Sequence, residues 1–311
     1  MNEMVYWLAI QEKFWLFYPH MLEKALKEAN SIEKVWTASE EMLLKWGMTR
    51  QHVKRFVKYR RNVSLERFER MLEEISQKQI KIIPYTSPEY PKILKSKKWL
   101  PKLQPPRVLF HKGTILKELD EGKCVAIIGK RKCSELASEK AYEFGKELAE
   151  KGFIVVSGLA VGVDTQAHRG AIEAGGKTVA ALPWMLPIYP SQNSELAEKI
   201  IKQGCLLSEV YNKPKENIKW RIWERNKITT GLSTYVIVVE TGTSGGTVNT
   251  ATNAIRQGIK TYILKLEEWS ADKLRGFEKL KEKGAIPIKD VDDFLKQAEK
   301  PKATLDNYIQ K

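Results

Sequence analysis

The segment from Cys124 to Leu264 decides the fold, because short apolar runs in it alternate with stretches of helical periodicity. Three of these runs lead directly into turns rich in glycine, serine or charged residues. The pairs are VAII (125–128) before GKRKCS (129–134), IVV (154–156) before SGLAVGVD (157–164), and VIVV (236–239) before ETGTSGGT (240–247). Runs that are apolar throughout are typical of strands covered on both faces, and helix-length connections between them indicate parallel pairing.

The same alternation predicts the order of the elements. We expect strands at 108–110, 125–128, 153–156, 178–182, 205–207, 236–239 and 261–264. We expect helices at 138–150, 164–174, 194–202, 247–257 and 271–283, with a short one at 225–231. This order predicts an α/β fold, namely a Rossmann-like, doubly wound, mostly parallel sheet, preceded by a small helical N-terminal domain.

The domain organisation follows from changes in composition along the chain. Residues 1–80 show helical spacing of apolar side chains and are predicted to form the helical N-terminal domain. Residues 81–113 contain six prolines, which break helices, and are predicted to be a connector. Residues 114–290 are predicted to form the Rossmann-like domain and residues 291–311 a C-terminal tail, of which the last ten or so residues are expected to be loose.

The charge balance favours a polyanionic partner. The 311 residues include 53 Lys+Arg and 38 Asp+Glu, a formal net charge of +15. Lysine-rich solvated faces give the same balance without any ligand. From Lys45 to Arg61 there are seven Lys/Arg and no acid, and the turn GMT (47–49) before a basic helix resembles small helical DNA-binding modules. A helix with a solvated outer face also explains that pattern and is the favoured alternative.

Other features bear on the compartment. No apolar run reaches the roughly 20 residues that span a bilayer. The aromatic patch FWLFY (14–18) lacks the basic leader and cleavage site of a signal peptide. Cys124, Cys133 and Cys205 are odd in number and show no CxxC spacing, so neither a disulfide framework nor a zinc site is expected. We therefore predict a cytoplasmic protein with no membrane partner.

The glycine-rich turns predict a phosphate site. In open parallel sheets the carboxyl ends of the strands and the N-termini of the helices converge on one crevice that favours anions. Glycine lets a phosphate approach the backbone, and arginine holds it with a bidentate fork. The candidate residues in the turns are Gly129, Lys130, Arg131, Ser134, Gly158, Gly162, Ser244 and Gly245. Ser134 is also expected to cap the next helix, and each turn alone is compatible with a plain strand–helix connection.

A basic, aromatic segment follows the fifth predicted strand. Its candidate contacts are Lys219, Trp220, Arg221, Trp223, Arg225, Asn226 and Lys227. Cations interleaved with aromatic rings suit single-stranded nucleic acid, because phosphates meet the cations and bases stack on the rings. The alternative is that both tryptophans belong to the core, but their charged neighbours disfavour full burial.

One pair of residues has the types needed for acid–base catalysis. Asp164 and His168 are four residues apart on a predicted helix. No nucleophile has a defined place beside them, so we interpret the pair as structural. We predict no catalytic residue, no metal site and no cofactor.

The ordered set of junctions resembles the DprA/Smf family of DNA-processing proteins. The matching segments, in consistent order over about residues 85–265, are YPKIL (90–94), PPRVLFHKG (105–113), GKRKCS (129–134), SGLA (157–160) with Gly162, Asp164, Ala167, His168 and Gly170, IYP (188–190) with Asn193, LSE (207–209), RNKI (225–228), GLS (231–233) and VVE (238–240) with SG (244–245). The resemblance implies a protein that binds single-stranded DNA, forms a homodimer and helps load a RecA-family recombinase, with no established catalysis. It assigns DNA contacts to Arg131, Lys219 and Arg225.

The sequence departs from the family pattern at three places. Lys130 replaces a usual serine, Val161 replaces a common arginine, and Ile222-Trp223 stands where the family favours Phe-Pro, which moves the expected stacking ring to Trp223 or Trp220. The alternative function is a nucleotide sensor or a phosphoribohydrolase of the lysine-decarboxylase-like group. The nearest segment to that group's motif, TSGGTV (243–248), lacks its proline and its downstream glutamate. A dehydrogenase fits less well, because the first turn is not GxGxxG.

Overall fold

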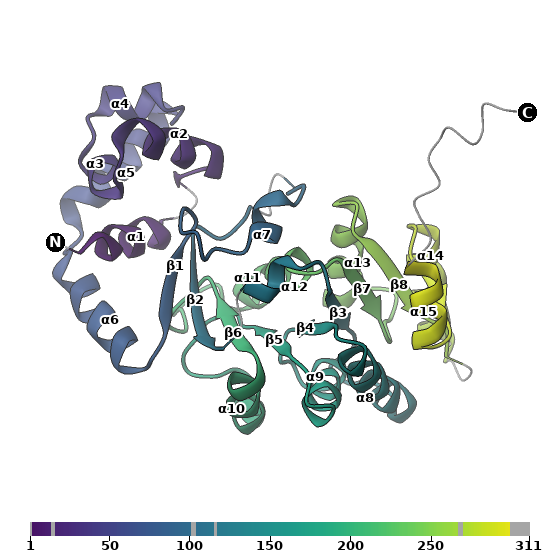
Figure 1. Ribbon diagram of the computed structural model, residues 1–311. Helices are drawn as coiled ribbons and strands as arrows, with labels where there is room; N and C mark the ends of the chain where they lie inside the picture. Colours follow the sequence, from purple (N-terminus) through teal and green to yellow (C-terminus); the bar gives the residue numbers. More distant parts are fainter. Residues whose placement is uncertain (1, 14–15, 101–103, 115–116, 267–269, 299–311) are drawn as a thin grey trace, which may run out of the picture.

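The computed structural model describes residues 2–13, 16–100, 104–114, 117–266 and 270–298 (Figure 1). Its centre is a nine-stranded sheet in the order β1-β2-β6-β5-β4-β3-β7-β8-β9. All neighbours from β6 to β9 in that order are parallel, and β1 and β2 join the β6 edge antiparallel. The strands are β1 (Lys81–Pro84), β2 (Val108–Gly113), β3 (Cys124–Ile128), β4 (Ile154–Ser157), β5 (Thr178–Ala181), β6 (Cys205–Ser208), β7 (Tyr235–Val238), β8 (Lys260–Leu264) and β9 (Ile286–Ile288). The predicted fold class is confirmed.

Helices cover both faces of the sheet (Figure 1). They are α8 (Glu135–Glu150), α9 (Val163–Glu173), α10 (Ser194–Gln203), α11 (Ile218–Glu224), α12 (Asn226–Gly231), α13 (Gly246–Arg256) and α14 (Ala271–Glu282). Side chains of β3 alternate between the two faces: Val125 and Ile127 pack with α8 and α9, whereas Ala126 and Ile128 pack with α13 and α14. This alternation explains why the strand is apolar throughout.

The strand order reverses between β3 and β7. From β3 the chain proceeds through α8, α9 and α10 to β4, β5 and β6 on one side. It then returns to pair β7 with the other side of β3, in the register Val125 with Tyr235. Such a reversal leaves an open crevice beyond the carboxyl ends of the two strands, the usual ligand site of open α/β sheets.

Residues 81–113 were predicted to be a connector with one strand at 108–110, and the structure places more of them in the main sheet. They contribute β1 and β2 to the main sheet and a short helix, α7 (Lys92–Ser96), and a 3-10 turn, η2 (Lys117–Asp120), follows. Proline is tolerated there because Pro84 ends the edge strand, where one side of the backbone makes no ladder hydrogen bonds. The antiparallel hairpin was hidden by the proline-rich stretch between its strands.

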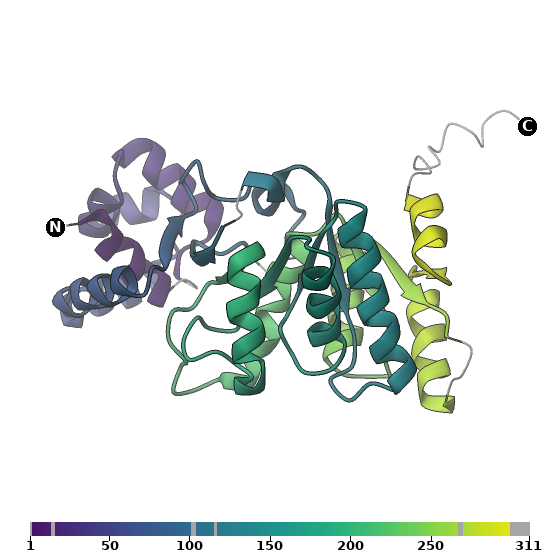
Figure 2. The ribbon, with the colours of Figure 1, turned by 60° about the horizontal axis from the view of Figure 1, so that its bottom comes forward.

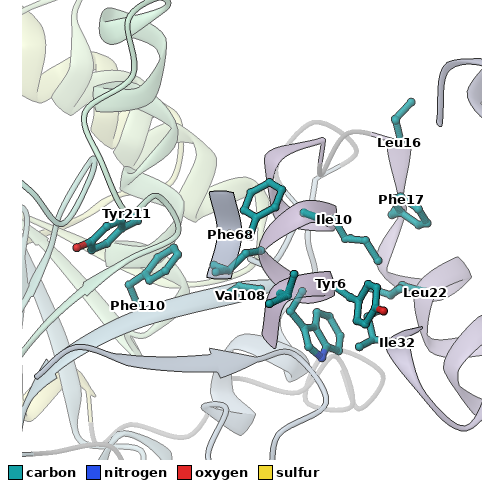
Figure 3. Close-up of a cluster of buried hydrophobic side chains, with 14 of the residues drawn as sticks. Tyr6, Ile10, Leu16, Phe17, Leu22, Ile32, Phe68, Val108, Phe110 and Tyr211 are labelled. Carbon is teal, nitrogen blue, oxygen red and sulfur yellow. The ribbon is translucent and has the colours of Figure 1, made fainter. Parts of the chain in front are cut away.

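The N-terminal helical prediction is confirmed, and these helices share a core with the sheet. They are α1 (Glu3–Glu12), α2 (Pro19–Ala29), α3 (Ile32–Thr37), α4 (Glu40–Lys45), α5 (Arg50–Asn62) and α6 (Glu66–Gln77). Figure 3 shows Val108 and Phe110 of β2, with Tyr211, beside Phe68 of α6 and the helix α1. In the basic helix α5, Val53, Phe56 and Val57 are buried and its outer side is exposed. Phe14 and Trp15 lie outside the described residues.

The predicted C-terminal tail, 291–311, begins with a helix. Helix α15 (Val291–Ala298) follows β9 and contacts α8. Phe294 is fully buried against Tyr235, Tyr262 and Phe153. Figure 2 shows α15 and the N-terminal helices at opposite ends of the sheet. Residues 299–311 lie outside the described part of the chain. No helix in that part is long and apolar enough to cross a membrane.

Candidate nucleic-acid interface

A cavity of about 620 Å³ opens where the strand order reverses, and we name it the switch pocket. The turns after β3, β4 and β7 all contribute to its lining, together with α11 and the start of α12. The residues assigned from sequence that line it are Gly129, Lys130, Arg131, Gly158, Lys219, Trp223, Arg225, Asn226 and Ser244. The structure thus brings together segments that are far apart in the sequence, as convergence of strand ends requires.

The pocket is strongly cationic. Its charged lining residues are Lys130, Arg131, Lys132, Lys219 and Arg225 against Asp164 and Asp272. Arg131, Lys132 and Lys219 are exposed and so present their charges to solvent. Asp272 is partly engaged, because Thr243 Oγ1 donates to its Oδ1 at 3.3 Å. The excess of cations on an open, concave surface suits an anionic ligand.

Glu240 holds the turn after β3 in place. Its Oε2 accepts hydrogen bonds from the N–H (3.2 Å) and hydroxyl (2.5 Å) of Ser134 and lies 2.8 Å from Lys273 Nζ. Its backbone carbonyl accepts from Lys130 N–H at 3.1 Å. Ser134 also accepts from Ala137 N–H at 3.3 Å, so its predicted capping role is confirmed. Ser134 lies outside the pocket lining, because its hydroxyl serves Glu240 and α8.

Gly162 lets the second turn pack against the first. Its φ is +86°, and a Cβ there would lie 2.5 Å from the carbonyl oxygens of both Lys130 and Arg131. Val163 N–H in turn donates to Lys130 O at 3.3 Å. Only glycine combines this backbone conformation with this close approach. Gly162 therefore positions Arg131 and does not itself line the pocket.

Arg225 is the buried floor of the pocket. It is 6% exposed, and its Nη1 donates to the carbonyl of Ala181 at 2.6 Å. Burial lowers the pKa of Arg225 to about 10, while Asp164 opposes that change. The guanidinium therefore stays charged at neutral pH, directly beneath Gly158. The sequence assigned Arg225 to DNA contacts but gave no indication that its side chain is buried.

The basic, aromatic segment forms a helix, α11, where the sequence had predicted only the later one. Trp223 is half-buried and lines the pocket, and Asn226 Nδ2 donates to Thr250 Oγ1 of α13 at 2.8 Å. Trp220 is 42% exposed outside the pocket lining. The Arg221 guanidinium lies 5.0 Å from the Trp220 ring centroid and pairs with Glu224 at 2.9 Å.

Lys227, which the sequence assigned to DNA binding, lies outside the lining of the switch pocket. Its side chain is buried, with Nζ 2.8 Å from Glu209 Oε2 and 3.3 Å from Glu224 Oε1. Burial, and then the charge of Glu209, raise the pKa of Glu224. A buried lysine between two carboxylates offsets part of their negative charge and joins α12 to the end of β6. Its position beside Arg225 and Asn226 in sequence concealed this inward orientation.

The third turn closes the far side of the pocket. Ser244 is exposed and lines it, while Gly245 caps α13 with a φ of +108° and lies outside the lining. Thr247 Oγ1 donates to the carbonyl of Gly129 at 2.9 Å, which ties this turn to the first. Backbone N–H groups at the start of an α-helix of this length add a positive potential.

Asp164 and His168 have separate hydrogen-bond partners. Asp164 Oδ2 accepts from the N–H groups of Gly158 (3.1 Å) and Ala160 (3.3 Å), which holds the second turn closed. His168 is fully buried, with Nδ1 2.7 Å from Thr178 Oγ1. Burial lowers the pKa of His168 to about 3, so the ring is neutral. Among the described residues, no cluster of three His, Cys, Asp or Glu could hold a metal ion.

A second cavity, of about 510 Å³, adjoins the switch pocket. The residues that line this cavity alone were not predicted as site residues from the sequence. We name it the aromatic pocket. Its own lining residues are Val161, Trp184, Pro187, Ile188, Tyr189, Pro190, Ser191, Gln192 and Lys213, and it shares Arg131, Gly158, Ala160, Ile222 and Arg225 with the switch pocket. The segment IYP (188–190) was the available signal, but it carried no charge to suggest a ligand.

A family model described as DNA recombination-mediator protein A matches residues 81–299. The chain belongs to this family, DprA/Smf. It is 35% identical over 196 residues to DNA processing protein DprA of Bacillus subtilis, covering 63% of this chain and 64% of that one. It is 32% identical over 257 residues to Protein Smf of Synechocystis, covering 80% and 61%. The match thus spans under two thirds of the length of these curated relatives.

Solved DprA structures have the same fold. The X-ray structure of DprA from Streptococcus pneumoniae superposes with a TM-score of 0.76 at 24% identity, over 97% of this chain and 99% of that one. A DprA structure from Helicobacter pylori, described for its unique single-stranded DNA binding mode, gives a TM-score of 0.60 at 27% identity, over 71% and 95%. The nearly complete overlap with the former includes the N-terminal helices as well as the sheet.

Proposed function

We infer that this DprA/Smf protein binds single-stranded DNA in the switch pocket, as a DNA-processing protein of transformation or recombination. The observation that carries this inference is the convergence of three strand-end turns on one open cavity with exposed Arg131, Lys132 and Lys219. Such cations neutralise backbone phosphates whatever the base sequence. The single-stranded DNA binding described for the Helicobacter pylori relative supports the same ligand here.

Within the pocket, we assign the phosphate contacts to the exposed side chains and the shaping of the site to the buried ones. Arg131 and Lys219 are the principal contacts, with Lys130, Ser244 and the Gly129 turn beside them. Trp223 supplies an aromatic surface at the rim, while Trp220 and Arg221 extend the strand's path along α11. Gly158, Gly162 and Arg225 set the shape of the floor.

A titration with single-stranded and duplex oligonucleotides over a salt series tests this function. The expected result is tighter binding of the single strand, with log K falling linearly with log salt by about 0.7 per phosphate contact. A salt-independent affinity, or equal affinity for the duplex, would contradict the inference. The same titration on the Arg131→Ala variant locates the site.

Partners beyond DNA are also proposed from the family. Proteins of a recombination-mediator family are expected to act with a RecA-type recombinase, and we propose this chain does so as a homodimer in the cytoplasm. Three free cysteines, of which Cys124 and Cys205 are buried, are compatible with a reducing compartment. Analytical ultracentrifugation, and strand-exchange assays with a purified recombinase on coated single strands, test these two points.

We propose that the protein is not an enzyme. The candidate acids Glu240 and Asp164 are committed to hydrogen bonds that hold the turns, and His168 is buried away from the pocket. The phosphoribohydrolase alternative needs an acid free to act on a bound nucleotide, and no observation favours it over DNA binding.

A further inference from the structure

The aromatic pocket has the character of a base-binding subsite. We propose that it receives an unstacked nucleobase of the DNA strand whose phosphates lie in the switch pocket, and that Tyr189 is the ring on which this base stacks. The proposal rests on the proposed function, because the switch pocket supplies the phosphate contacts. The aromatic pocket would add a second kind of contact, in which the ring of a base stacks on an aromatic side chain and no charge is involved.

The ring of Tyr189 is partly exposed and is supported by a buried neighbour. The side chain is 38% exposed, and its ring centroid lies 5.3 Å from that of Trp184, with the planes inclined at 47°. Trp184 is fully buried, and its Nε1 donates to the carbonyl of Pro187 at 2.9 Å. A supported tyrosine with a free outer side offers a large contact surface at low cost in conformational entropy.

The loop that carries Tyr189 is tied down at both ends. Asn193 Nδ2 donates to the carbonyl of Leu159 and to Thr165 Oγ1, both at 2.8 Å, which joins the loop to the second turn. Leu186 accepts from Lys213 N–H at 2.9 Å, which joins it to the segment after β6. Binding of a ligand in such a pre-formed pocket costs little conformational entropy, because the loop is already ordered.

The two pockets are continuous across a cationic boundary. Arg131 and Arg225 line both, and Gly158 lies between them. A phosphate held by Arg131 at this boundary therefore leaves its nucleoside free to extend into the aromatic pocket. The described lining of that pocket contains no acidic side chain, and Ser191 and Gln192 offer hydrogen bonds to base edges.

This arrangement explains a preference for single strands that phosphate contacts alone do not give. A duplex carries the same phosphates, but its bases are stacked and paired, and extruding one costs energy. A single strand unstacks readily and so can use both pockets. We therefore expect the aromatic pocket, and Tyr189 in particular, to supply much of the discrimination against duplex DNA.

Two ligands of equal length separate the base contact from the phosphate contacts. One is oligothymidylate, and the other is an abasic phosphodiester chain, which has the phosphates without the bases. Tyr189→Ala should weaken binding of oligothymidylate about tenfold, within the range found for base–aromatic stacking, and leave the abasic chain unaffected. Tyr189→Phe should bind like the unaltered protein. Tyr18→Ala, which removes a comparably exposed tyrosine of the N-terminal helices, is the matched control.

The outcomes separate this proposal from the proposed function. Arg131→Ala should weaken binding of both ligands, and if it weakens neither, the phosphate site itself is wrong. If Tyr189→Ala affects both ligands equally, or neither, the base subsite is wrong although the phosphate site stands. A test without substitution uses oligonucleotides carrying 5-iodouracil, which on irradiation should form an adduct at Tyr189 in the unaltered protein. Adducts confined to other residues would overturn the proposal.

Discussion

The guanidinium of Arg225 lies directly against the backbone of Gly158, so that a Cβ at Gly158 would fall 1.9 Å from Nη1. The same nitrogen donates to the carbonyl of Ala181. One buried cation thus joins the turn after β4, the end of β5 and the start of α12. The floor of the switch pocket depends on this contact.

Gly158→Ala is expected to destabilise the protein and weaken DNA binding. The new methyl group must displace Arg225 from the carbonyl of Ala181, and the loss of a hydrogen bond to a charged group costs about 1.5–3 kcal/mol. Urea unfolding measures the free energy. Gly246→Ala is the control for stability alone, because a Cβ there meets nothing within 4 Å although the residue lines the switch pocket. Equal stability of the two variants would show that Arg225 can move freely.

Arg131→Ala should weaken binding of single-stranded DNA without changing the fold. Arg131 is exposed in a turn, so the core is untouched, and a lost phosphate contact of about 1.5–3 kcal/mol corresponds to roughly 10- to 150-fold in Kd. Fluorescence titration measures Kd, and circular dichroism checks the fold. Arg169→Ala, at an exposed site on α9 that lines neither pocket, should bind normally. A Kd unchanged by Arg131→Ala would contradict the site.

Lys227 and Lys219 should respond in opposite ways. Lys227→Met removes the cation paired with buried Glu209 and leaves buried Glu224 with Arg221 alone, and it should lower the free energy of unfolding by about 3–5 kcal/mol. Lys219→Ala removes an exposed side chain and should leave stability unchanged while weakening DNA binding. Thermal melts and titrations on both variants check this. A stable Lys227→Met variant with weak DNA binding would restore Lys227 as a contact.

His168 should make stability depend on pH. Its pKa in the folded chain, about 3, lies below the ordinary 6.5, so below pH 6.5 the unfolded chain binds a proton that the folded chain does not. The contribution of His168 to the free energy of unfolding is therefore complete above pH 6.5. It declines by up to about 1.4 kcal/mol per pH unit as the pH falls towards 3. His168→Asn should lack this decline between pH 6.5 and 5 in urea unfolding. An identical slope in both proteins would mean that the ring is protonated in the fold.

Incubation with nucleoside mono- and triphosphates and magnesium should release neither base nor phosphate. Glu240 is fully buried, with Oε2 bound to Ser134 and Lys273, and Asp164 accepts two backbone N–H groups. Chromatography of the products measures release. Turnover that Glu240→Gln abolishes would move the protein to the enzyme class.

The sequence predicted the parallel strands β3 to β8 well, because each is a short apolar run next to a glycine-containing turn. It missed β1 and β9, since neither shows that pattern: β1 ends on Pro84, and β9 is a three-residue strand with proline at its centre. Among site residues, Arg131 was found from its place after a strand. The burial of Lys227 was not predicted. The arrangement of α11 and α12 directs this side chain inward, and the local sequence does not indicate that Glu209 lies opposite it.

The shared core of β2 and the N-terminal helices has a consequence for how the molecule moves. Besides the contacts of Phe110 and Phe68, Gln11 Nε2 donates to the carbonyl of Glu209, and Arg107 donates twice to the carbonyl of Phe17, all in buried positions. A hinge motion between the N-terminal helices and the sheet would break these hydrogen bonds in an interior from which water is excluded. The helices and the sheet should therefore melt in one cooperative transition, and a strand bound in the switch pocket should raise the melting temperature of both together.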